Sequence, residues 1–114
     1  MRRRYMELVE RLRSSVLQGK GKTDPALRQA VAARSAELGG GPAAPPGAAI
    51  PAALRDLVDK TALHAYQITD EEIQALRRAG YSEDQIFEIA ISAAVGGGLA
   101  RLERGLAALE GGQR

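Results

Sequence analysis

Glu88 and His64 are the two side chains whose types best suit acid–base chemistry. His64 is the only imidazole in the 114-residue chain, and an imidazole can act as a general base near neutral pH. Glu88 shares a predicted helical face with Val95 and Leu106, so partial burial could shift its pKa. These two residues are therefore the candidate catalytic residues.

Each candidate also has a structural explanation, which is the favoured one. His64 flanks an apolar stripe with no second catalytic group beside it, as a half-buried boundary residue would. Buried acids are usually paired, so Glu88 could form an intersubunit salt bridge. The candidate partners are Arg77, Arg101 and Arg104.

Other charged clusters have simpler explanations than a site. The acids between Asp70 and Asp84 fall in the first turns of two predicted helices, where they favour the helix dipole. Residues 1–50 carry nine Lys and Arg against four acids, a net +5, and residues 51–114 carry seven against ten, a net −3. The basic half contains Arg2, Arg3 and Arg4 but no nucleic-acid motif, so nucleic-acid binding is disfavoured.

The chain contains no cysteine and one histidine. This composition excludes a disulfide framework, a thiolate zinc site and a Cys nucleophile. We therefore expect no metal and no cofactor. The longest weakly polar run, 89–100, is too short to span a bilayer, and the N-terminus lacks a secretory signal. The expected location is the cytoplasm, without membrane association.

The composition favours an all-α fold of about five helices. Aromatic residues make up only 4% of the chain, the abundant residues favour helix, and no alternating β-branched run indicates a strand. Two capping boxes, Thr69 with Glu72 and Ser82 with Gln85, are separated by Gly80, which suits a left-handed helix end. The expected helices cover residues 3–18, 24–38 (ending at Gly39), 51–66 and two capped segments within 68–109.

A Gly- and Pro-rich segment, 39–51, divides the chain. Two helices are too few to form a core alone, so we expect one domain over 1–114. Within it, residues 1–38 form a two-helix arm, 39–51 a linker and 52–110 the helical core.

The last predicted helix is apolar on most sides, which is typical of a central helix or one shared between subunits. Gly96, Gly97 and Gly98 lie in its middle, and each costs about 1 kcal/mol relative to Ala. A kink or a closely packed backbone would explain them. We therefore expect a dimer- or trimer-based homo-oligomer formed through this helix.

From about Leu57 to Leu109 the sequence resembles the carboxymuconolactone decarboxylase and alkylhydroperoxidase D-like family, notably in the phrase QIFEIAISAAVGGGLARLER. The resemblance implies an oligomeric all-α bundle. It also implies that the family's catalytic Glu falls on Gln85, its two Cys on Gly97 and Ala100, and its His on Arg104. Without thiols, peroxidase chemistry is not expected.

Two functions follow from these observations. The favoured function is a non-catalytic or structural helical oligomer of this family. The alternative is a cofactor-free decarboxylase or isomerase of a small carboxylic acid, with Glu88 or His64 as the acid–base group and an Arg that holds the substrate carboxylate.

Overall fold

The computed structural model describes residues 2–44 and 49–111, and these contain helices and no strand. The expected all-α class is confirmed. The helices are α1 (Arg2–Gln18), α2 (Pro25–Leu38), α3 (Ala52–Leu63), a short 3-10 helix (Ala65–Gln67), α4 (Asp70–Arg78) and α5 (Glu83–Gly111). Part of the expected linker, 45–48, lies outside the described residues.

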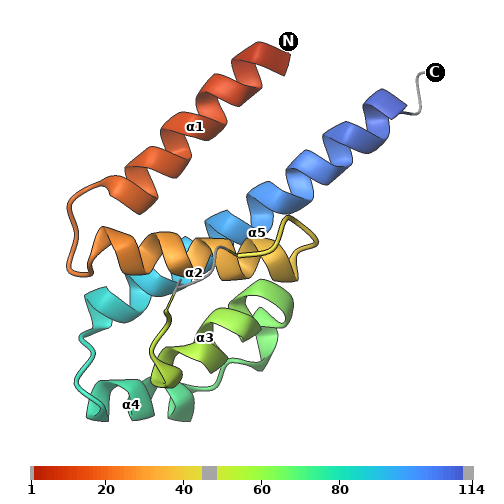
Figure 1. Cartoon of the computed structure of the whole chain (residues 1–114). Coiled ribbons are helices and arrows are strands. Elements are labelled where there is room, and N and C mark those ends of the chain that lie inside the picture. The colour runs from red at the N-terminus through yellow and green to blue at the C-terminus, as the bar shows by residue number, and fades with distance from the viewer. Residues whose placement is uncertain (1, 45–48, 112–114) are drawn as a thin grey trace.

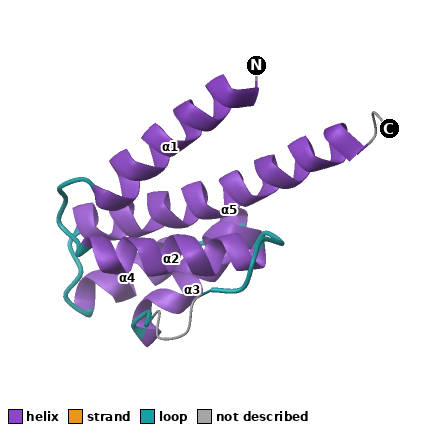
Figure 2. Ribbon diagram, turned by 45° about the horizontal axis from the view of Figure 1, so that its top comes forward, coloured by secondary structure: helices purple, strands orange, loops and turns teal. Residues whose placement is uncertain are grey.

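The core lies where α2 and α3 pack against the first half of α5 (Figure 1). Its largest fully buried apolar side chains are Val31, Leu54, Val58 and Ile89. Of the two helices expected to form an N-terminal arm, α2 contributes buried side chains to this core. Only α1 extends away from it, beside the C-terminal half of α5 (Figure 2).

The two capping boxes and the helix end at Gly80 form as the sequence predicts. Thr69 accepts a hydrogen bond from the Glu72 N–H at 3.2 Å. Ser82 accepts from the Gln85 N–H at 3.1 Å, while the Gln85 side chain accepts from the Ser82 N–H at 2.8 Å. Gly80 has a φ of 105°, which is the left-handed conformation that glycine adopts without strain. The α4–α5 hinge is therefore fixed by short-range contacts.

Two helix ends differ from the sequence prediction. After α2 the residue with a left-handed backbone conformation is Gly40, with a φ of 93°. Gly39, the expected helix end, has a φ of −79°. The third helix ends at Leu63 instead of near Tyr66. At this end His64 leaves the helical conformation, with φ −149° and ψ 57°, and the Ala62 carbonyl accepts a hydrogen bond from the Arg101 side chain at 2.5 Å.

The three adjacent glycines do not interrupt α5. A Cβ at Gly96 would overlap the backbone of Ala32, and one at Gly97 would lie 2.8 Å from Ser35 Oγ. The prediction of a closely packed backbone is therefore confirmed for Gly96, where that backbone is α2 of the same chain, while at Gly97 the close neighbour is the Ser35 side chain. Gly98 differs from both, because nothing lies within 4 Å of the place where its Cβ would be.

Candidate functional site

Glu88 holds the loop that joins α1 to α2. One of its carboxylate oxygens accepts a hydrogen bond from the Lys22 N–H at 2.6 Å. The other accepts from the Thr23 N–H at 3.0 Å and from the Thr23 hydroxyl at 2.7 Å. A Cβ added at Gly21 would lie 2.6 Å from this carboxylate, so a side chain at residue 21 would force the end of the Glu88 side chain to move.

The surroundings of Glu88 act on its pKa in opposite directions. Burial raises the pKa, while the hydrogen bonds from Lys22 and Thr23 and the positive charge of Arg28 lower it. The net effect is a pKa below the ordinary value of a glutamate. The carboxylate is thus stabilised in its charged form, which suits an anchor better than a proton donor.

Arg28, in the first turn of α2, is a buried charge that contacts the same loop, and it is not among the predicted site residues. Its side chain is 3% exposed and donates to the carbonyls of Val16 at 2.6 Å and Gly19 at 2.5 Å. These carbonyls belong to the end of α1, where helices leave acceptors unpaired. Its position one turn after the N-cap Asp24 was the available signal, but its partners precede the helix and cannot be inferred from periodicity.

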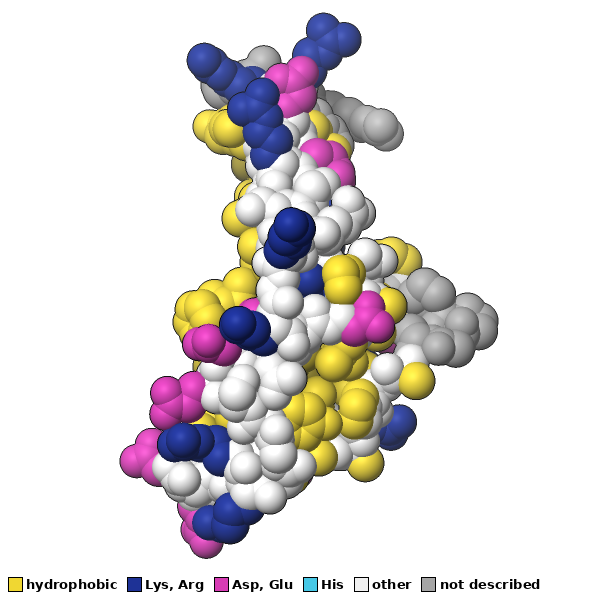
Figure 3. Space-filling model, turned by 90° about the vertical axis from the view of Figure 1, so that its left-hand side faces the viewer, with side chains coloured by type: hydrophobic (Ala, Val, Ile, Leu, Met, Phe, Trp, Pro, Cys, Tyr) yellow, Lys and Arg dark blue, Asp and Glu magenta, His cyan; other side chains and the backbone are white. Residues whose placement is uncertain are grey.

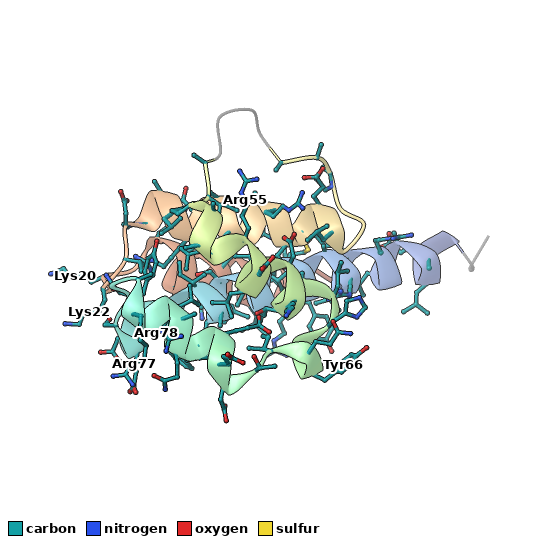
Figure 4. The ribbon with its side chains drawn as sticks, turned by 90° about the horizontal axis from the view of Figure 1, so that it is seen from below. Lys20, Lys22, Arg55, Tyr66, Arg77 and Arg78 are labelled. Atoms are coloured by element: carbon teal, nitrogen blue, oxygen red, sulfur yellow. The ribbon has the colours of Figure 1, made fainter. Side chains whose placement is uncertain are left out.

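His64 lies elsewhere on the molecule, at the C-terminal end of α3. It is exposed and packs edge-on against the ring of Tyr66, with centroids 5.9 Å apart. Figure 4 shows Lys22 at the left edge of the molecule and Tyr66 well to its right, beyond α4. Arg101, which binds the end of α3, stands thirteen residues from Glu88 along α5, or about 20 Å at the rise of an α-helix.

The structure therefore does not bring the two candidate catalytic residues together. Glu88 borders a shallow groove of ≈ 170 Å³ that also includes Lys20, Phe87 and Ile91, and His64 does not line this groove. Within this chain the hydrogen-bond partners of Glu88 are groups of the α1–α2 loop, and the expected intersubunit arginine stays a prediction.

The positions matched to the family's redox residues serve packing and capping. Gln85 caps α5 and also donates to the Lys22 carbonyl at 3.4 Å. Gly97 faces α2, Ala100 is buried, and Arg104 lies against Gly40. Among the described residues, no group of three or more His, Cys, Asp and Glu side chains could hold a metal ion.

A second exposed feature is a set of large apolar side chains on α1 and α5. It occupies one side of α1 and α5, and Figure 3 shows hydrophobic side chains along one edge of the narrow end that carries both termini. Its most exposed large members are Tyr5, Leu8, Leu12, Phe87, Leu102 and Leu109. We call this surface the α1–α5 face.

Helix α5 also has the length and composition of a membrane span, measured over Glu83–Glu110. The apolar window is thus longer than the twelve-residue run considered in the sequence, because the helix continues past Arg101. Within that window 39% of the residues are buried in the protein. Helices in the core of a folded protein commonly have the same length and apolar composition.

Comparison with known proteins finds no matching family, no matching curated protein and no matching solved structure.

Proposed function

We propose that this protein is a non-catalytic, homo-oligomeric structural module built on a helical scaffold like that of the carboxymuconolactone decarboxylase-like family. The observation that carries the proposal is the α1–α5 face, which exposes large side chains such as Tyr5 (52% exposed) and Leu109 (66%) on two adjacent helices. Large exposed apolar patches mark sites of association. A homo-oligomer would cover this face with an identical surface.

The alternative, a cofactor-free decarboxylase or isomerase, has no comparable support. Both carboxylate oxygens of Glu88 already accept hydrogen bonds from the loop. A general acid or base must reach its substrate within hydrogen-bond distance, and His64 does not line the groove that Glu88 borders.

Sedimentation velocity over a range of micromolar concentrations tests the proposal. We expect a reversible dimer or larger oligomer that shifts toward smaller species on dilution. A monomer throughout this range would overturn the proposal. Flotation with lipid vesicles is the companion measurement, and a chain that is monomeric in buffer but floats with lipid would show that the face serves a membrane instead.

A further inference from the structure

The outward side of α5 carries seven positions with a symmetric arrangement. In chain order they are Phe87, Ile91, Ala94, Gly98, Leu102, Gly105 and Leu109. We call them the outer strip. Their distances from Gly98 are four, seven and eleven residues in each direction. A two-fold rotation about an axis through Gly98, which reverses the direction of the helix, therefore places each position of the strip on another position of the strip.

The sizes of the side chains nearest the centre are complementary under the same operation, while at the ends Phe87 would meet Leu109. Leu102 would meet the Ala94 position, and Ile91 would meet the Gly105 position. The centre, Gly98, would meet itself. No heavy atom lies within 4 Å of an added Cβ at Gly98 or Gly105, so nothing in the described chain explains the absence of side chains there. A helix packed closely over α5 would explain it.

Gly98 also lies one residue from the midpoint of α5, which runs from Glu83 to Gly111. An antiparallel α5 centred on Gly98 would therefore overlap the whole helix. The C-terminal half of each α5, which extends beyond its own core (Figure 1), would then lie on the core half of the other.

Helix α1 extends this surface on the same side of the molecule. Val16 lines the same groove as Phe87 and Ile91. Leu12, Leu8 and Tyr5 follow at intervals of four, four and three residues, which keeps them on the helical face of Val16. Two copies of the α1–α5 face would thus form a four-helix arrangement.

From these observations we propose that two copies of this chain pair through the α1–α5 face, with their α5 helices antiparallel and crossing at Gly98. This inference rests on the proposed homo-oligomer and specifies its symmetry. A two-fold axis produces an interface in which each copy uses the same residues, as the symmetric strip requires.

The available area is sufficient for a stable dimer. With 29 residues in α5 and 17 in α1, strips about 43 Å and 25 Å long and about 10 Å wide cover about 700 Å² on each copy. The total of about 1,400 Å² lies within the range of specific interfaces.

The charges at the two ends favour a second copy over a lipid surface. The Arg13–Glu103 ion pair (3.3 Å) joins α1 to the C-terminal half of α5, and the basic start of α1 lies toward the C-terminal end of α5 (Figure 2). In the antiparallel pair that end meets the second copy's Asp84, and opposite charges would face each other. A lipid surface would instead have to accommodate the acids of α5.

Engineered cysteines test the arrangement directly, because the natural chain has none. We expect Gly98→Cys to form an intermolecular disulfide with itself under mild oxidation. Gly105→Cys is the matched control: its two copies would stand about 20 Å apart along the axis, beyond the reach of a disulfide. Ala94→Cys and Leu102→Cys should each fail alone and form a disulfide when the two variants are mixed.

The outcomes separate this inference from the proposed function. Equally efficient self-linking of the Gly98, Gly105 and Ala94 variants would indicate parallel helices and overturn the inference. A stable dimer without any of these disulfides would overturn it as well, while the homo-oligomer stands. A monomeric wild-type chain would overturn both.

Gly98→Leu provides a second test. The isolated chain has room for this side chain, so the circular dichroism spectrum should be unchanged, whereas the dimer should weaken by about tenfold or more through overpacking. Ala108→Leu, on α5 but outside the outer strip, is the control and should leave the dimer intact. Dimerisation of Gly98→Leu with wild-type affinity would overturn the crossing point.

Discussion

At the scale of single residues, the charged side chains of Glu88 and Arg28 both hold the loop between α1 and α2 in place. Glu88 accepts hydrogen bonds from Lys22 and Thr23, and Arg28 donates to carbonyls at the end of α1. Both groups hold residues 16–23 and line the same groove. A carboxylate that accepts several hydrogen bonds is costly to remove, because its partners are left without an acceptor.

Glu88→Gln should destabilise the fold by about 2 kcal/mol at pH 7, the usual size for hydrogen bonds to a charged group. The folded pKa of Glu88 is lowered, so its contribution is present above the unfolded pKa and is lost as the pH falls through the folded pKa. In urea unfolding, the gap between wild type and variant should therefore be large at neutral pH and shrink in acid.

The control for this measurement is Glu10→Gln, which removes an exposed acid 3.8 Å from Arg13. It should change the stability by less than about 0.5 kcal/mol. A gap between wild type and Glu88→Gln that stays constant from neutral to acidic pH would contradict the assigned role of the charge.

At the scale of elements, local signals were predictable and distant contacts were not. The capping boxes at Thr69 and Ser82 and the stop at Gly80 involve residues within a few positions of one another, so the sequence reveals them. The hydrogen bond at the end of α3 comes from Arg101, which is 39 residues away from Ala62. The partners of Glu88 are 65 and 66 residues away, and no periodicity encodes such a pairing.

The crossing of α2 and α5 supplies a test at the same scale. Gly96→Ala would place a methyl group on the rigid backbone of Ala32, and separating the helices should cost about 3 kcal/mol. Gly105→Ala, at an open position of the same helix, should gain up to about 1 kcal/mol from helix propensity. Thermal or urea unfolding of dilute protein would distinguish them, and equal effects would contradict the close approach of α2.

At the scale of the whole molecule, the fold is more elongated than a compact domain with this number of residues. Its principal extents are 53 × 28 × 26 Å and its radius of gyration is 15.0 Å, against about 13 Å for a compact domain of this length. The excess comes from α1 and the end of α5, which leave apolar side chains exposed. A second copy would convert this projection into an interior.

The ends of that projection supply a test by charge reversal. If Arg4 of one copy stands level with Asp84 of the other, Arg4→Asp and Asp84→Arg should each weaken the dimer, because like charges then meet at both ends of the two-fold interface. For exposed pairs we expect about a tenfold increase in Kd at low salt, and less as salt screens the charges. The double variant restores opposite charges and should recover most of the affinity in sedimentation equilibrium.

Arg78→Asp, which reverses an exposed charge on α4 outside the face, is the control and should leave Kd unchanged. Additive losses in the double variant would mean that Arg4 and Asp84 do not meet, and the antiparallel register would have to be abandoned.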